Sequence, residues 1–82
     1  MRKAVEIFAE KMEEKLATKD DARGEDGWLN HATTVKFLLN RLEEEVLEAK
    51  EKFDECAPAK LSAECVDIAK FAMMVSDRLR GR

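Results

Sequence analysis

The stretch from residue 63 to residue 79 carries apolar side chains on nearly every side of the helix that its composition predicts. A helix of this kind is stable only when neighbouring elements cover more than one of its sides. The whole chain has 82 residues, which is close to the lower limit at which one core is adequate. We therefore expect this segment to be a central helix, and a second copy of the chain to supply part of its cover.

Two earlier segments have the three- and four-residue apolar spacing of amphipathic helices. The first runs from residue 3 to about 18 and should end before the polar, glycine-containing segment 19–27. The second should begin between Asn30 and Thr33 and continue to about Cys56. Its expected inward row consists of Val35, Leu38, Leu42, Val46, Ala49 and Phe53.

A short turn should join the second and third helices. Pro58 ends any continuation of the second helix, and Ser62 is the expected N-cap of the third. A turn over residues 57–61 is short enough to lay the two helices antiparallel. The sequence thus predicts one all-α domain over residues 1–82: a short amphipathic helix, a long antiparallel helical hairpin, and a bundle completed by homo-oligomerisation as a homodimer or a dimer of dimers.

Composition excludes several classes of function. The chain has 15 Lys and Arg against 18 Asp and Glu, and a net charge of −3 argues against a nucleic-acid polymer as partner. No apolar run approaches the roughly 18 residues of a membrane span, and a signal-peptide pattern is lacking. We therefore expect a cytoplasmic protein with no membrane partner. Cys56 and Cys65 are too few for a disulfide scaffold, and we expect free, mostly buried thiols.

Two acidic pairs lie where the apolar faces of the second and third helices should meet. Glu45 lies only about 20° from Leu38 around its helix axis, and Glu48 follows one turn later. Glu64 and Asp67 form a second pair of this spacing on the apolar third helix. Carboxylates beside a buried surface are costly unless something compensates them. Four of them near one turn indicate a site for hard divalent cations, with Mg²⁺ expected and Mn²⁺ as the alternative.

The same pairs resemble the signature of the MazG-like all-α nucleoside triphosphate pyrophosphohydrolases, which is ExxE followed after a gap by ExxD. Residues 45–48 are Glu-Val-Leu-Glu, and residues 64–67 are Glu-Cys-Val-Asp. The family often has a further acid before the first Glu, and Glu44 supplies it here. The resemblance extends from about Phe8 to Asp77, and so includes most of the chain.

A small, phage-type subgroup of this family is the most similar. Its members carry a run like the Glu-Cys-Val-Asp-Ile-Ala-Lys-Phe-Ala-Met-Met at residues 64–74, and a Gly-Trp like Gly27-Trp28. Two positions depart from the subgroup: Lys70 replaces an Asn, and Glu25-Asp26 replaces a basic residue before the Gly-Trp. A charged lysine can donate to phosphate but cannot ligate a metal, so these departures put the subgroup's substrate preference in doubt.

The resemblance implies hydrolysis of a (deoxy)nucleoside triphosphate between its α and β phosphates, releasing monophosphate and pyrophosphate. Such an activity serves house-cleaning or remodelling of the dNTP pool. The implied metal ligands are Glu45, Glu48, Glu64 and Asp67. Glu44 or Glu48 would orient or deprotonate the attacking water, and the sequence does not separate these two roles.

The candidate substrate-binding residues are Trp28, His31, Lys36, Lys70 and Arg78, and Arg41 is a further basic residue that could meet a triphosphate. Trp28 is either a stacking platform for the base or a hydrophobic anchor for the segment before the second helix. His31 is either a contact to the base edge or a capping residue. Lys70 and Arg78 have the best case among the basic residues, because they extend from the helix that bears Asp67.

Two alternatives stay open. In one, the chain is a non-catalytic helical homo-oligomeric interaction module whose acids are solvated or pair with a basic partner. It predicts that Glu45→Gln or Asp67→Asn leaves the stability unchanged or improved, with no response to Mg²⁺. In the other, the metal site hydrolyses a related nucleotide such as phosphoribosyl-ATP, which a substrate panel would reveal.

Overall fold

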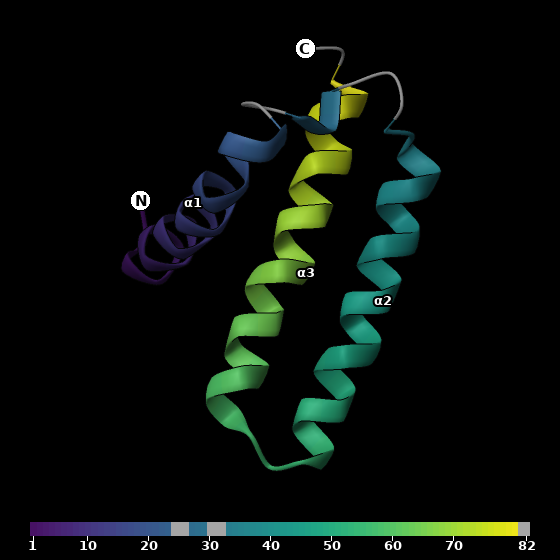
Figure 1. The fold of residues 1–82 in the computed structure, drawn as a ribbon. Helices are drawn as coiled ribbons and strands as arrows, with labels where there is room; N and C mark the ends of the chain where they lie inside the picture. The colour runs from purple at the N-terminus through teal and green to yellow at the C-terminus, as the bar shows by residue number, and fades with distance from the viewer. Residues whose placement is uncertain (24–26, 30–32, 81–82) are drawn as a thin grey trace.

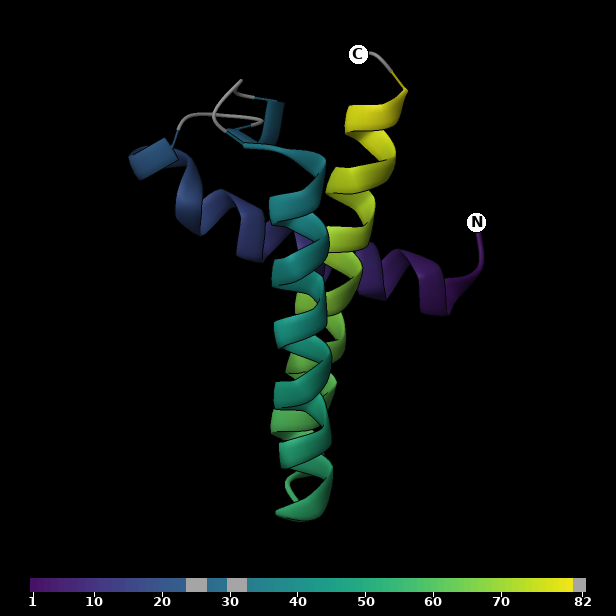
Figure 2. The ribbon, with the colours of Figure 1, turned by 90° about the vertical axis from the view of Figure 1, so that its right-hand side faces the viewer.

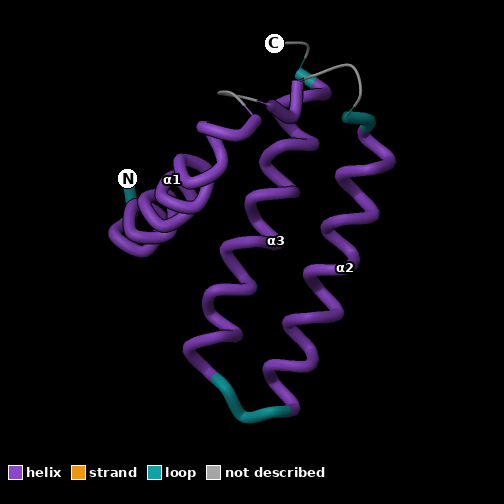
Figure 3. Tube along the Cα trace, in the orientation of Figure 1, coloured by secondary structure: helices purple, strands orange, loops and turns teal. Residues whose placement is uncertain are grey.

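The computed structural model describes residues 1–23, 27–29 and 33–80, and every element in these ranges is helical. The elements are α1 (Lys3–Arg23), the 3-10 turn η1 (Gly27–Leu29), α2 (Val35–Asp54) and α3 (Pro58–Leu79). Figure 3 shows a short turn between α2 and α3. The predicted all-α class is confirmed for the described residues, whereas completion of the bundle by a second copy stays a prediction.

The helices α2 and α3 form the predicted antiparallel hairpin, which is the long axis of the molecule (Figure 1). Helix α1 packs on the α3 side and crosses the hairpin steeply, as Figure 2 shows. The central position of α3 between the other two helices agrees with its apolar composition. None of the described helices combines the length and the apolar character that a membrane span requires.

Helix α1 ends, and helix α2 begins and ends, at residues other than those predicted from the sequence. Helix α1 continues to Arg23, well beyond residue 18, because extending an existing helix costs little where no Gly or Pro interrupts it. Helix α2 begins at Val35, after the predicted start, since the Thr34 hydroxyl caps it by accepting from the Phe37 N–H at 3.0 Å. It ends at Asp54, before Cys56, whose φ of 57° is incompatible with a continuing helix.

Pro58 is the first residue of α3, so the prediction of a Ser62 N-cap is wrong. A proline at this position loses no hydrogen bond, because the first N–H of a helix has no partner, and its φ is already helical. Ser62 lies exposed inside the helix. The turn is therefore shorter than the predicted 57–61, and α3 gains one helical turn.

The core is small and lies at the crossing of the elements. Leu38, Phe71 and Met74 are buried, and they pack against a shell of half-buried side chains: Leu16, Trp28, Leu42, Met73 and Val75. Two predictions of burial are wrong. Both thiols, Cys56 and Cys65, are exposed, and Phe53 of the expected inward row is 70% exposed.

Candidate metal centre

Three carboxylates from the two arms of the hairpin come together at one point. Glu45 and Glu48 lie one turn apart on α2, and the antiparallel α3 brings Glu64 opposite them. One carboxylate oxygen from each residue lies within 4.8 Å of the other two. Ligands on opposite sides of a Mg²⁺ ion are about 4.2 Å apart, so this spacing is close to what one ion requires.

Burial within this acidic cluster differs from one residue to the next. Glu45 is only 6% exposed, Glu64 is half-buried and Glu48 is exposed. The Oε2 atom of Glu64 is buried and has no hydrogen-bond partner among the described residues. A buried carboxylate oxygen without a partner is costly, and a bound cation would compensate it. The donor set, the spacing and this oxygen fit a hard divalent cation.

The cluster is also electrostatically strained in the absence of a cation. Burial raises the pKa of the Glu45 carboxyl above its usual 4.5, and the adjacent Glu64 carboxyl adds to the effect. The Glu45 carboxyl in turn raises the pKa of Glu48. Both shifts have the sign expected for acids that share a site without enough positive charge, so either a proton or a cation stabilises them.

Arg41 supplies part of the missing charge. Its Nη2 donates to Glu45 Oε1 at 3.0 Å, and its Nη1 donates to Glu44. The Glu44 carboxylate raises the pKa of Arg41 further above its usual value. The guanidinium lies over the Phe71 ring, 5.2 Å from the centroid, and this contact helps to hold its position. Glu44 itself is exposed and forms an ion pair with Arg41.

Asp67, the fourth predicted ligand, lies beside the ammonium groups of two lysine side chains. The Lys15 Nζ atom of α1 donates to Asp67 Oδ1 at 2.9 Å and to the Ala63 carbonyl at 3.0 Å. Lys70 Nζ lies 3.7 Å from the same oxygen and 5.0 Å from the Phe71 centroid. The charge of Asp67 still contributes to the raised pKa of Glu45, so the two carboxylates are neighbours.

Lys15 is the residue of this site that the sequence analysis did not name, and Arg41, named there as a basic residue that could meet a triphosphate, instead pairs with the acids of its own helix. Arg41 had a signal in the sequence, because it lies three and four residues before Glu44 and Glu45 on one helix. Lys15 had none, since it reaches Asp67 across 52 positions of the chain.

No family model, curated protein or solved structure matches the chain. Its function must therefore be inferred from the chemistry of its own residues.

The other predicted substrate residues lie at the far end of the hairpin or outside the described residues. The Trp28 Nε1–H donates to the buried Asp77 Oδ2 at 3.0 Å, and its indole packs against the core. Arg78 donates to the carbonyls of Trp28, at 2.8 Å, and Thr33. These contacts anchor η1 to α3. Lys36 is exposed on α2, and His31 lies outside the described residues.

Trp28→Phe tests the anchoring role. The change removes the indole N–H and leaves the buried Asp77 with one donor fewer, so the free energy of unfolding should fall by about 1–3 kcal/mol in a urea titration. In an Asp77→Ala background the same change should cost clearly less, because the shared hydrogen bond is already lost. An unchanged urea midpoint in Trp28→Phe would exclude a structural role and favour base stacking.

Proposed function

We propose that the chain is a Mg²⁺-dependent pyrophosphohydrolase of the MazG-like type. It would convert a (deoxy)nucleoside triphosphate to monophosphate and pyrophosphate, as dNTP-pool house-cleaning or remodelling in the cytoplasm. The observation that carries the proposal is the buried, unpartnered Oε2 of Glu64 inside a cluster of three converging carboxylates. The resemblance of residues 45–48 and 64–67 to the ExxE and ExxD signature supports it.

Glu45, Glu48 and Glu64 are the proposed ligands of the Mg²⁺ ion, for which Mn²⁺ is the alternative. Asp67 is the fourth proposed ligand, and it would have to exchange the Lys15 ammonium for the metal. When bound, divalent ions neutralise charge on the phosphate oxygens and lower the pKa of a coordinated water.

The chain's own side chains would divide the remaining tasks. Glu48 is the exposed member of the cluster, so its carboxylate is accessible to a water molecule and suited to accept its proton. This supports Glu48 over Glu44 as the base, because Glu44 is engaged by Arg41. The Lys15 and Lys70 ammonium groups lie beside the cluster, where a phosphate could take over from Asp67 as their anionic partner.

A substrate panel tests the proposal. Purified protein is incubated with each of the eight common NTPs and dNTPs and with phosphoribosyl-ATP, in the presence of Mg²⁺, and the products are resolved by ion-exchange chromatography. We expect monophosphate and pyrophosphate in equal amounts from at least one nucleotide, and none after addition of EDTA. Cleavage of phosphoribosyl-ATP alone would assign the related activity. Release of orthophosphate, or silence from a folded protein across the panel, would contradict the proposal.

One observation favours the non-catalytic interaction module as the second candidate. Glu45 and Asp67 already have cationic partners within the chain, in Arg41 and Lys15. Acids that are paired in this way can be purely structural. The two candidates differ in their expected response to Mg²⁺, because only the hydrolase holds the ion between its acids.

A further inference from the structure

Lys15 is the described side chain through which α1 makes polar contact with the hairpin. Its Nζ atom donates to Asp67 Oδ1 at 2.9 Å and to the Ala63 carbonyl at 3.0 Å, and these two acceptors lie one turn apart on α3. No other described side chain of α1 forms a hydrogen bond or ion pair with α2 or α3. The docking of α1 on α3 therefore depends in part on Asp67 as an acceptor for Lys15.

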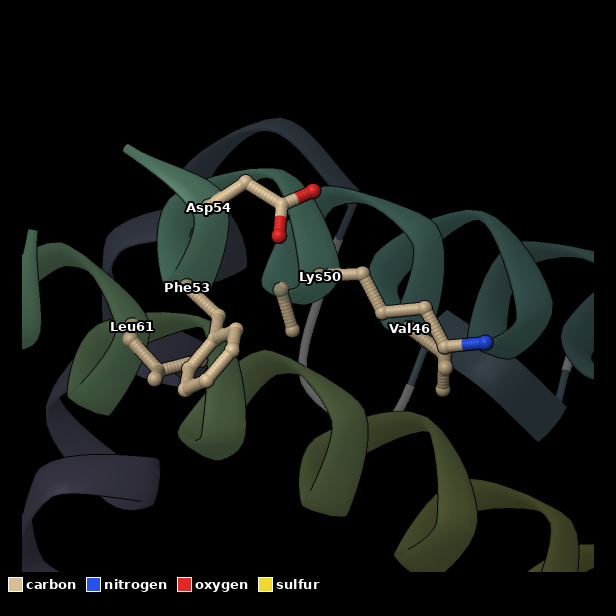
Figure 4. A pocket seen from close by; sticks show the side chains of 6 residues that line it. Val46, Lys50, Phe53, Asp54 and Leu61 are labelled. Atoms are coloured by element: carbon tan, nitrogen blue, oxygen red, sulfur yellow. The ribbon is translucent and has the colours of Figure 1, made fainter. Parts of the chain in front are cut away.

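Apolar packing holds α1 only weakly. Phe8, Met12 and Leu16 are half-buried, and none of the described side chains of α1 is buried. Figure 2 shows the reason, since α1 crosses the hairpin steeply and one of its ends projects on each side. The open groove near the hairpin turn, where Figure 4 shows Phe53 and Leu61, is lined by α2 and α3 and by no residue of α1. A helix with so few buried contacts is sensitive to the loss of one polar contact.

Asp67 also belongs to the surroundings of the acidic cluster. It lies one turn after Glu64 on α3, and its charge contributes to the raised pKa of Glu45. As the fourth proposed ligand, it would present its carboxylate to the Mg²⁺ ion. An ammonium group and a divalent ion on one carboxylate repel each other strongly, because both charges are positive and only a few ångströms apart. The carboxylate of Asp67 therefore cannot hold Lys15 and the metal equally well.

Lys15 is the cation that would leave Asp67. The ion pair is weak, because the side chains of Lys15 and Asp67 are 35% and 20% exposed. Lys70, the other cation beside Asp67, is held more firmly: its side chain is 13% exposed, and its Nζ lies 5.0 Å from the centroid of the Phe71 ring. A divalent cation at Asp67 should accordingly displace Lys15 and leave Lys70 in place.

We propose that the ion pair between Lys15 and Asp67 is a latch, which holds α1 against α3 in the metal-free protein and opens when a divalent cation binds Asp67. Metal binding and the docking of Lys15 then oppose each other, and each weakens the other by the same factor. The 3-10 turn η1 keeps its own anchors to α3, through Trp28 and Arg78, so α1 loosens without detaching. The inference rests on the metal site of the proposed function, and it does not depend on which nucleotide is cleaved.

Isothermal titration calorimetry with Mg²⁺ at low ionic strength tests whether Lys15 opposes the metal. Lys15→Met should bind the ion about three- to fivefold more tightly than the wild type, because Asp67 no longer has to give up an ion pair. Methionine keeps an unbranched apolar stem, so the packing of this side chain is largely preserved.

Lys11→Met is the matched control for this titration. Lys11 is exposed on the same helix, one turn before Lys15, and forms no ion pair among the described residues. The variant loses the same charge without touching Asp67, so its affinity for Mg²⁺ should stay within about 1.5-fold of the wild type.

Hydrogen exchange of the backbone amides, followed by mass spectrometry with and without saturating Mg²⁺, tests whether α1 loosens. In the wild type and in Lys11→Met, Mg²⁺ should raise the exchange rate of α1 about threefold, which is the factor expected for the loss of one exposed ion pair. In Lys15→Met, α1 should already exchange at the raised rate without the ion and should not respond to it.

The outcomes separate the latch from the metal site. Mg²⁺ that binds the wild type without changing the exchange of α1 would overturn the latch and leave the metal site standing. Equal affinities of Lys15→Met and Lys11→Met for Mg²⁺ would have the same meaning. An absence of Mg²⁺ binding in all three proteins would overturn the metal site itself, and the latch with it.

Discussion

Glu48→Gln is expected to lower the turnover number for pyrophosphate release by about 100- to 1,000-fold, which is the usual cost of losing one charged group that acts in the transition state. The substitution preserves the size of the side chain and removes only its charge. It also removes a like charge beside Glu45, so the variant should be at least as stable as the wild type. The measurement is steady-state kinetics on the preferred nucleotide at saturating Mg²⁺.

Glu51→Gln is the matched control for this experiment. Glu51 lies on the same helix, is exposed and is not part of the acidic cluster. The same change of charge at this position should leave the turnover number unchanged. Equal losses in both variants would point to a general electrostatic effect, and full activity in Glu48→Gln would remove Glu48 from the proposed site.

Mg²⁺ is expected to raise the melting temperature of the wild type by roughly 10 °C or more. At an ion concentration of about 100 times the dissociation constant, binding adds about 2.7 kcal/mol, and each kcal/mol moves the midpoint of a domain of this size by about 4–8 °C. Glu45→Gln should show a much smaller shift, because it lacks one proposed ligand. In EDTA, Glu45→Gln should have a higher melting temperature than the wild type, because the variant no longer buries a charge beside Glu64.

The pH dependence in EDTA has a definite sign. The pKa of Glu45 is raised on folding, so the folded state binds the proton more tightly than the unfolded state. The contribution of this group to stability is therefore greatest below its unfolded pKa of about 4.5 and is lost as the pH rises through the higher folded value. The stability advantage of Glu45→Gln over the wild type should accordingly be largest above the raised folded pKa of Glu45 and diminish as the pH falls towards 4.5. Differential scanning calorimetry of the two proteins at matched pH measures it.

Equal Mg²⁺ shifts in the wild type and Glu45→Gln would contradict the metal site. That outcome would favour the interaction module, in which Arg41 alone compensates Glu45.

Several features of the fold could be predicted from local patterns. The apolar spacing predicted three helices, and the short segment around Pro58 predicted the antiparallel hairpin. The residues at which helices begin and end were harder to predict, because the same residue type can either stop a helix or start one. Pro58 is incompatible with the interior of a helix but well suited to its first turn, and only the conformation of Cys56 and Ala57 decides between them.

The sequence alone determined the acidic pairs, since a spacing of three residues places two side chains on one face of any α-helix. The antiparallel hairpin then places Glu64 opposite Glu45 and Glu48. Only the tertiary structure decided the surroundings of Asp67. Its contact with Lys15 depends on how α1 crosses α3, and no periodicity along the chain encodes the angle between two helices that meet through residues 52 positions apart.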